Sequence, residues 1–425
     1  MIYLFFFFFM FFPHCKSFNR QIISHLLIFP STPLFFPPLL SSFPFLLLLI
    51  IHAISYPSIK MPLSPEDEVV AMVQSVTPPT VPPHRSHDPS NNQKRTDPFL
   101  FGSRYLEEGD DVFEFNAWDH VEPDDEFKAF AETQYAKQRE APVSDFDRNR
   151  FNADPAKWWN LFYKNNTANF FKDRKWLRQE FPVLADVTSP GAGPQVVLEV
   201  GAGAGNTAFP LVAHNQNDEL MVHACDFSKT AVKVMRESPH YNPKHIVADV
   251  WDVAAQPDEN GDGLPPGLSE GSVDVVVLIF ILSALSPAQW EQALRNIYRV
   301  LKPGGQVLFR DYGRGDLAQV RFKKQRYMGE NFYVRGDGTR VYFFDKDELH
   351  HMWSRWTPEG GLPPTPERDS SAEATEESTP STGVFDIQKL GVDHRMIVNR
   401  QRKLKMYRCW IQGHFTKRVT PERTG

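Results

Sequence analysis

Cysteine is scarce in this chain of 425 residues. Three are present, Cys15, Cys225 and Cys409, and they lie far apart in the sequence. So few cysteines cannot form a disulfide framework, and their spacing matches no zinc-binding pattern. The cysteine content therefore favours a reducing compartment, and we expect the protein in the cytoplasm, with the nucleus as an alternative.

Long uninterrupted apolar runs are also missing, although residues 1–60 are rich in phenylalanine and leucine and hold no acidic residue. A membrane span needs about 20 consecutive apolar residues, and the prolines of this segment, together with Lys16 and Arg20, break every run earlier. A signal peptide begins with positive charge, whereas this chain begins with apolar residues. We interpret residues 1–60 as a leader or as an artefact of the gene model, with translation starting at Met61. A membrane anchor is the weaker alternative.

The two adjacent histidines near residue 350 lack the spacing of metal ligands. His350 and His351 are adjacent, whereas two ligands on one helical face stand three or four residues apart. We therefore expect no metal.

Composition divides the remaining chain into three regions. Residues 61–97 are rich in proline, serine, threonine and charge without apolar periodicity, which is typical of a disordered tail. Residues 98–182 are aromatic and helix-prone, and we expect a helical cap. Residues 183–425 alternate apolar runs with helical patterns, which predicts an α/β domain with a mostly parallel sheet. A proline- and serine-rich stretch, residues 357–382, is expected to be a disordered loop inserted in that domain.

Five apolar runs are the candidate parallel strands: residues 196–200, 221–225, 245–250, 273–280 and 306–311. Helical spacing covers residues 230–238 and 286–301, and Lys302-Pro303-Gly304-Gly305 is expected to stop the second helix. Residues 341–344, 383–390 and 406–415 are expected to supply late strands.

A glycine-rich turn follows the first strand, in the sequence Val197-Leu198-Glu199-Val200-Gly201-Ala202-Gly203-Ala204-Gly205. Glycines allow a sharp turn and let a ligand approach bare backbone. Dinucleotide enzymes use the spacing G-x-G-x-x-G to hold a pyrophosphate, which the carboxylate of Glu199 would repel. The turn therefore favours the amino-acid end of S-adenosylmethionine, contacted at Glu199, Gly201, Gly203 and Gly205; a plain structural turn is the alternative.

Acidic residues follow the next two strands. Asp226 ends the second strand, where a carboxylate can accept both ribose hydroxyls of a nucleotide. Asp249 and Asp252 follow the third strand, and either one could meet the adenine amine. Ile279 ends the fourth strand and could cover the adenine ring. Helix capping or solvation for the carboxylates, and core packing for Ile279, are the alternatives.

The most distinctive run in the chain is Asn331-Phe332-Tyr333-Val334-Arg335-Gly336-Asp337-Gly338-Thr339-Arg340. Together with the glycine turn and residues 101–106, 112–119, 159–164, 169–174, 225–228, 278–284, 310–313 and 321–323, it resembles the tRNA N3-methylcytidine methyltransferase family. That family includes fungal enzymes acting on threonine and serine tRNAs. The resemblance spans roughly residues 97–415, apart from the inserted loop.

The resemblance implies a Rossmann-like class I methyltransferase with an RNA-contacting N-terminal cap. It implies methyl transfer from S-adenosylmethionine to N3 of cytidine 32 in the tRNA anticodon loop. Threonine and serine tRNAs are the implied partners, and a seryl-tRNA synthetase stays open as a protein partner. Carried over by motif, the cofactor contacts are Trp159, Tyr163, Gly201, Asp226, Asp252 and Ile279, with Asp252 preferred to Asp249 because it follows Trp251.

Cytosine N3 lies on the pairing edge of the base, so the target must be unpaired, as it is in a loop. N3 carries its own lone pair, and no strong base has to remove a proton. The methylated product is cationic, and we predict that Asp311, beside Tyr312, stabilises that charge.

A net charge of −6 argues mildly against an RNA ligand, but basic residues cluster among aromatic ones in three segments near residues 157–178, 310–340 and 395–408. Such clusters suit phosphate contact, although a solvated surface is the alternative. The predicted RNA contacts are Lys172, Arg174, Arg310, Arg321, Lys323, Arg335 and Arg340.

Two other functions stay open at this point. A methyltransferase acting on a protein or a small molecule would keep the glycine turn without needing the basic clusters. A non-catalytic RNA-binding module would keep the fold as a scaffold.

Overall fold

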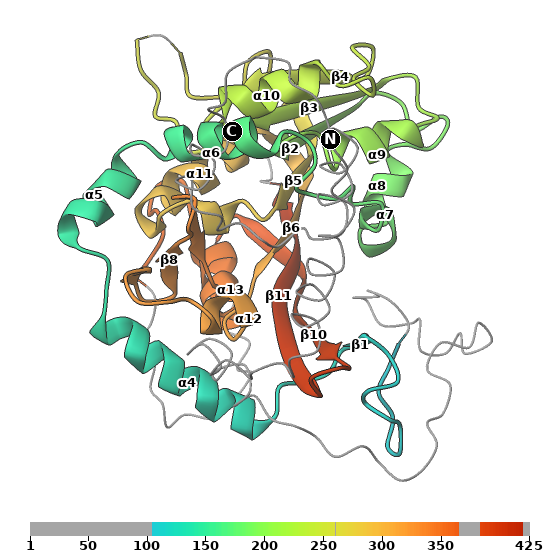
Figure 1. Ribbon diagram of the computed structural model, residues 1–425. Coiled ribbons are helices and arrows are strands. Elements are labelled where there is room, and N and C mark those ends of the chain that lie inside the picture. Colours follow the sequence, from blue (N-terminus) through green and yellow to red (C-terminus); the bar gives the residue numbers. More distant parts are fainter. Residues whose placement is uncertain (1–103, 260, 365–382, 420–425) are drawn as a thin grey trace, which may run out of the picture. The chain divides into compact units, whose positions relative to one another are not determined.

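A mixed sheet of eight strands organises the computed structural model, which describes residues 104–259, 261–364 and 383–419 (Figure 1). The strand order is β1-β10-β11-β6-β5-β2-β3-β4. The expected leader and tail, residues 1–60 and 61–97, lie outside the described residues, as do residues 365–382 of the expected inserted loop. Within the described ranges, no helix has the length and apolar character needed to cross a membrane.

Five strands form the parallel half of the sheet: β2 (Gln195–Val200), β3 (Leu220–Asp226), β4 (Ile246–Val250), β5 (Val273–Ile279) and β6 (Leu301–Tyr312). All five predicted strands are confirmed. The order reverses between β2 and β5, and open α/β sheets bind ligands beyond the carboxyl ends of their strands at such a point. The predicted Rossmann-like α/β class is confirmed.

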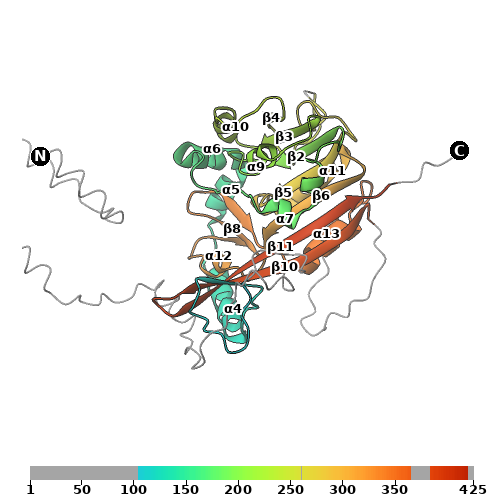
Figure 2. The same cartoon turned by 90° about the vertical axis from the view of Figure 1, so that its right-hand side faces the viewer.

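β10 (Phe385–Asn399) and β11 (Leu404–Lys417) form a long antiparallel hairpin that pairs with β6 through β11. Figure 2 shows this hairpin running past the rest of the sheet. The three-residue strand β1 (Ala117–Asp119) pairs with its outer edge. This strand departs from the expected helical cap: Trp118 is fully buried against the helix that follows, so the aromatic run there packs as sheet.

Helices cover both faces of the parallel strands. α7 (Leu177–Glu180), α8 (Val183–Asp186), α9 (Ala208–Ala213) and α10 (Lys229–Arg236) lie on one face, and α11 (Pro287–Val300) lies on the other. α13 (Lys346–Arg355) shares the core of α11 but packs against β10 and β11 of the hairpin. Alternate strand residues serve the two faces, as with Val197 and Leu198, because side chains of a strand alternate in direction. α11 begins with a capping box of Ser286 and Gln289.

The described chain begins with three helices after β1, namely α4 (Asp125–Glu140), α5 (Asp145–Ala153) and α6 (Pro155–Asn166), and α6 lines the site described below. After β6 come α12 (Leu317–Val320) and a small sheet of β7 (Tyr327–Gly329), β8 (Phe332–Val334) and β9 (Arg340–Tyr342). A 3-10 turn, η2 (Leu282–Ala284), follows β5.

Two boundaries differ from the predictions. The Lys302-Pro303-Gly304-Gly305 stretch follows the end of α11 but already belongs to β6, which begins at Leu301 by pairing with Val273. Residues 357–364 were expected inside a disordered loop, yet the carbonyl of Pro358 accepts a hydrogen bond from Arg295 of α11 (2.6 Å). The backbone bridge between Thr357 and Gly361 closes this turn against the helix.

Candidate active site

A cavity of about 440 Å³ opens at the carboxyl ends of the parallel strands. It is lined by α6, by residues 170–176, by the glycine turn, and by the segments that follow β3, β4, β5, β6 and β8. The cavity therefore lies where the reversal of strand order predicts a ligand.

The glycine turn forms one wall of the cavity. Gly201 and Gly203 have φ values of 64° and 61°, which disfavour other residues. A Cβ atom on Gly203 would lie 2.4 Å from the hydroxyl of Tyr163, and one on Gly201 would lie 2.0 Å from Cδ1 of Ile281. Gly205 is not among the lining residues: its Cβ would meet the ring of Phe209 in α9, so this glycine serves the turn into the helix and the predicted cofactor contact is not supported.

Asp226 ends β3 and lines the cavity. Its Oδ2 accepts a hydrogen bond from the backbone N–H of Gly203 (2.8 Å), and its Oδ1 accepts one from Ser228 (2.7 Å). Burial raises the pKa of this carboxyl to about 6, although both N–H donors oppose the shift. An ionised carboxylate has about four lone-pair sites, so Asp226 can also accept hydroxyl donors from a ligand.

The two candidate aspartates after β4 are separated by the structure. Asp252 lines the cavity, and its Oδ1 accepts a hydrogen bond from Ala254 (2.9 Å). Burial raises its pKa. Asp249 instead forms an ion pair with Arg236 of α10 (2.6 Å) and is not a lining residue. The geometry thus agrees with the preference for Asp252.

Glu199 does not reach the cavity. Its Oε2 accepts a hydrogen bond from Ala208 at the start of α9 (3.0 Å), and its Oε1 lies 3.5 Å from Nη1 of Arg174. Burial raises its pKa to about 7, with Arg174 opposing the shift. Glu199 therefore lies behind the cavity wall, and its predicted contact with the cofactor stays a prediction. Glu199 holds Arg174, which does line the cavity.

The opposite wall comes from α6 and the end of β5. Trp159 and Tyr163 line the cavity as predicted positions, and Ile279 lines it from the end of β5. The amide oxygen of Asn160 accepts hydrogen bonds from the Ser228 hydroxyl (2.8 Å) and the Thr230 N–H (3.0 Å), which tie α6 to the start of α10. The aromatic wall is thus fixed relative to Asp226.

Tyr312 lines the cavity, whereas Asp311 is fully buried behind it. The Asp311 carboxylate accepts hydrogen bonds from the backbone N–H groups of Ser283 and Tyr312, both at 2.9 Å. Burial raises its pKa to about 6. The burial leaves no surface for direct contact with a base, and stabilisation of the methylated base by the Asp311 charge stays a prediction. The two hydrogen bonds hold Ser283 and Tyr312, two residues of the cavity wall, in place.

The predicted RNA contacts fall into three groups. Lys172, Arg174, Arg335 and Arg340 line the cavity, whereas Arg321 and Lys323 are exposed outside its wall. Arg310 is 1% exposed, inside the sheet, where it bonds Asp393 (2.5 Å) and Gln412 (2.7 Å). A phosphate contact at Arg310 is therefore excluded.

Arg340 is also buried, but at the cavity. Its guanidinium donates to the side chains of Asn152 in α5 and Gln289 in α11, both at 2.9 Å. It joins three elements around the cavity rather than facing solvent, and the predicted RNA contact of this residue stays a prediction.

Several lining residues were missed from the sequence, among them Trp176, Phe280 and Ser283. Phe280 has φ 63° directly after β5, and its ring lies 4.8 Å from that of Tyr312. Non-glycine residues in this conformation cluster at functional sites. No local sequence pattern predicts a positive φ at a phenylalanine.

One spacing in the chain matches a hydrolase motif: Gly267-Leu268-Ser269-Glu270-Gly271. A nucleophile elbow puts its serine between a strand and the following helix, at the carboxyl end of the sheet. Ser269 is exposed in the loop before β5, at the opposite edge of the sheet. The motif therefore carries no hydrolytic site here.

Comparison with known proteins assigns the family. A family model described as a methyltransferase domain matches residues 198–307. The tRNA(Thr) (cytosine(32)-N(3))-methyltransferase of Saccharomyces cerevisiae is 46% identical over 318 residues, which cover 75% of this chain and 46% of that protein. The tRNA N(3)-methylcytidine methyltransferase trm140 of Schizosaccharomyces pombe is 44% identical, covering 75% of this chain and 92% of that protein. The chain belongs to the tRNA N3-methylcytidine methyltransferase family. The resemblance seen in the sequence is thereby confirmed.

Other relatives extend the family comparison. The tRNA N(3)-methylcytidine methyltransferase Mettl2 of Drosophila melanogaster is 40% identical, with 77% of this chain and 91% of that protein covered. A solved S-adenosylmethionine-dependent methyltransferase from Methanosarcina mazei aligns with a TM-score of 0.37 and 14% identity, over 56% of this chain and 99% of that one. The chain spans less than half the length of the Saccharomyces cerevisiae protein but nearly all of the Schizosaccharomyces pombe one.

The cofactor of this methyltransferase family member is S-adenosylmethionine, and the cavity fits it. At Gly201 and Gly203 a Cβ atom would collide with Ile281 and Tyr163, so only glycine lets these two side chains pack against the turn that forms the cavity wall. The buried Asp226 and the half-buried Asp252 add acceptors for ribose and adenine donors. Among the described residues, no group of three or more histidine, cysteine or acidic side chains is arranged to hold a metal ion.

Proposed function

We propose that this chain methylates N3 of cytidine 32 in the anticodon loop of tRNA. The observation that supports this function most directly is the cavity of about 440 Å³, which combines nucleotide acceptors with an aromatic and cationic mouth. The family relatives are named for this reaction. Threonine tRNA is the favoured substrate, since the Saccharomyces cerevisiae relative is named for it. Serine tRNA, a seryl-tRNA synthetase partner and a cytoplasmic location stay predictions.

The cavity residues divide into a cofactor side and a base side. Gly201, Gly203, Asp226 and Asp252 are positioned to hold the cofactor, and Trp159 and Tyr163 enclose it. Tyr312 offers an aromatic face for an unpaired base, and the Phe280 ring lies beside it, tilted by 40° at 4.8 Å between ring centroids. Arg335, whose guanidinium carbon lies 5.7 Å from the Tyr312 ring centroid, brings positive charge to the mouth for the phosphate of a loop nucleotide.

S-adenosylmethionine supplies an electrophilic methyl carbon on a positively charged sulfur. The N3 lone pair of cytosine forms the new C–N bond as the C–S bond breaks, and the electron pair of that bond stays on sulfur. The positive charge thus moves from sulfur to the base, and no proton is transferred. Positioning of the base and exclusion of water supply the acceleration that this chain contributes. The Asp311 carboxylate contributes by fixing Ser283 and Tyr312 in the cavity wall.

Nucleoside analysis tests this proposal. The purified chain is incubated with S-adenosylmethionine and a threonine tRNA transcript, and the RNA is digested and examined by mass spectrometry against 3-methylcytidine and 5-methylcytidine standards. We expect 3-methylcytidine. Methylation of another atom of cytidine, or methylation of protein but not RNA, would overturn the proposed function.

A further inference from the structure

α4 lies outside the parallel part of the sheet and away from the cavity, beside the β10–β11 hairpin (Figures 1 and 2). Phe127, Ala131 and Tyr135 pack against Tyr407 of the hairpin and against Val320 of α12. This apolar contact accounts for the docking of the first half of the helix. It does not account for the polar residues buried near its C-terminal end.

Gln138 of α4 is 3% exposed, and a buried amide is costly unless it is hydrogen-bonded. Its Nε2 donates to the backbone carbonyls of Gln319 (3.0 Å) and Phe322 (3.2 Å), with Val320 at 3.4 Å. Its Oε1 accepts the hydroxyl of Tyr333 in β8 (2.9 Å). One side chain therefore holds the end of α12 and the middle of the small sheet together.

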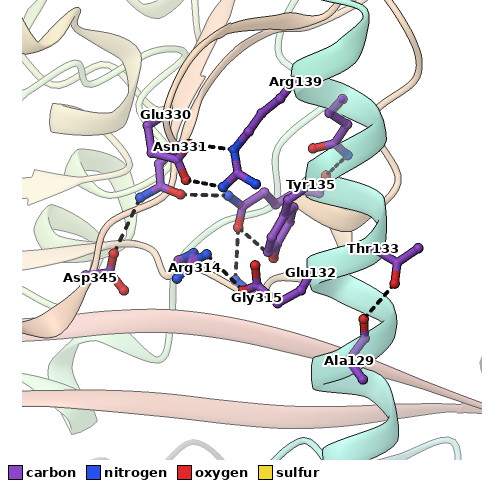
Figure 3. A network of polar contacts seen from close by, with 12 residues as sticks. Ala129, Glu132, Thr133, Tyr135, Arg139, Arg314, Gly315, Glu330, Asn331 and Asp345 are labelled. Carbon is purple, nitrogen blue, oxygen red and sulfur yellow. Dashed lines mark hydrogen bonds and ion pairs between the residues drawn. The ribbon is translucent and has the colours of Figure 1, made fainter. Parts of the chain in front are cut away.

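A second buried amide extends the network. Gln319 of α12 accepts hydrogen bonds from the Tyr135 hydroxyl (3.1 Å) and the Gly315 N–H (2.9 Å), and it donates to Asn331 (3.1 Å). Asn331 in turn donates to Asp345, the N-cap residue of α13. Figure 3 shows Tyr135 on α4 directed toward Gly315, with Asn331 between this group and Asp345. The helix, the loop after β6 and the small sheet are thus one connected unit.

The segment after α12 and strand β8, which Gln138 joins, lead to basic residues in two different positions. The segment after α12 presents Arg321 and Lys323 on the exposed surface. Tyr333 stands two residues before Arg335, whose side chain lines the cavity. The rings of Phe322 and Tyr333 stack at 4.7 Å and 7°, so a shift in one segment is transmitted to the other.

We propose that Gln138 is a positioning residue for the RNA substrate. It fixes the distance between the exposed Arg321–Lys323 segment and Arg335 at the cavity mouth, so that phosphates outside the cavity and the target base inside it are engaged together. This inference rests on the proposed function, because it assumes that an RNA backbone crosses both segments.

The test compares Gln138→Met, Tyr333→Phe and Thr133→Ala. The first removes the amide at similar volume, and the second removes only the hydroxyl bonded to it. The third is the matched control on the same helix, since the exposed Thr133 hydroxyl bonds the Ala129 carbonyl of its own helix (3.0 Å) (Figure 3). For each protein, kcat and KM for tRNA are measured well below the melting temperature, and Kd for S-adenosylmethionine is measured by calorimetry.

We expect Gln138→Met to raise KM for tRNA by about tenfold, the size expected when one charge-assisted hydrogen bond to a phosphate is broken. Kd for S-adenosylmethionine should stay within about twofold of wild type. Tyr333→Phe should shift KM in the same direction by a smaller factor, and Thr133→Ala should leave it unchanged. In a background of Arg321→Ala and Lys323→Ala, Gln138→Met should add no further increase, because the outer phosphate contacts whose distance from Arg335 it fixes are already absent.

Three outcomes overturn the inference. If the effects of Gln138→Met and of the double change at Arg321 and Lys323 on KM for tRNA are additive, Gln138 acts elsewhere. If Gln138→Met weakens S-adenosylmethionine binding as much as it raises KM, the fold is damaged in general. Wild-type KM in both Gln138→Met and Tyr333→Phe would remove the role altogether. If Gln138→Met does not fold, the KM of Tyr333→Phe for tRNA tests the inference instead: a raised KM supports it, and a wild-type KM overturns it. If the wild-type chain forms no 3-methylcytidine, the proposed function is wrong, and so is this inference, which rests on it.

Discussion

At the scale of single residues, Asp249 and Asp252 show how location separates chemically identical side chains, both of which are half-buried. Asp252 faces the cavity, whereas Asp249 pairs with Arg236. Asp252→Ala should raise Kd for S-adenosylmethionine roughly tenfold to a hundredfold, since a hydrogen bond to a charged group is worth about 1.5–3 kcal/mol. Asp249→Ala is the matched control and should leave Kd within about twofold. Equal losses in the two variants, measured by calorimetry, would contradict the assignment.

Asp226 predicts opposite effects of pH on binding and on stability. Its pKa of about 6 means that lowering the pH from 7.5 to 5 protonates the carboxylate, which should weaken cofactor binding by about tenfold. Because the folded-state pKa lies above the unfolded one, the folded chain binds this proton more readily. Its contribution to the free energy of unfolding is therefore largest at low pH and is lost as the pH rises through about 6.

The difference between wild type and Asp226→Asn isolates this group from the other titrating side chains. In urea unfolding of the cofactor-free chain, wild type should gain stability relative to Asp226→Asn between pH 7.5 and pH 5. Parallel pH profiles for the two proteins would show that Asp226 does not titrate in this range.

Asp311 predicts a loss of turnover without a loss of cofactor. Asp311→Asn replaces an acceptor of two N–H groups by an amide that can satisfy only one of them with its oxygen. Ser283 and Tyr312 should shift, and a misplacement of about 1 Å can lower the rate about a hundredfold. The measurement is single-turnover kinetics with saturating cofactor. Undiminished turnover would remove the positioning role.

At the scale of elements, the parallel strands could be predicted because each is a short apolar run that both faces of the sheet bury. The glycine turn and the acidic residues after β3 and β4 followed from them, since the carboxyl ends of parallel strands meet at one edge. The long hairpin was predicted only in part: β10 carries Lys389, Asp393 and Arg395 and is half-exposed, so apolar runs mark less of its length. The conformation of Phe280 and the Gln138 network depend on contacts between distant segments, which local patterns do not report.

The segment after α12 carries the element-scale prediction on RNA. Replacing Arg321 and Lys323 by alanine should weaken tRNA binding and lower the slope of log Kd against log salt by about 1.4, or roughly 0.7 for each phosphate that is no longer neutralised. Lys244→Ala is the control, because Lys244 pairs with Asp218 beyond the amino end of β4 (2.8 Å). A slope that changes equally in both proteins would show that the segment has no special part in binding.

At the scale of the whole molecule, a chain with a net charge of −6 is expected to bind a polyanion through a few basic segments around one cavity. Arg310 and Arg340 show that a cluster of basic residues in the sequence overstates that surface, because ion pairs and hydrogen bonds bury some of its members. The predicted start at Met61 lies outside the described residues and stays a prediction.

The most direct measurement of the central claim is methyl incorporation into two threonine tRNA transcripts that differ only at position 32, one with cytidine and one with uridine there. With labelled S-adenosylmethionine, the account predicts label in the cytidine transcript and none above background in the uridine one. Equal labelling of both transcripts, or label in neither under conditions where the chain binds its cofactor, would contradict it.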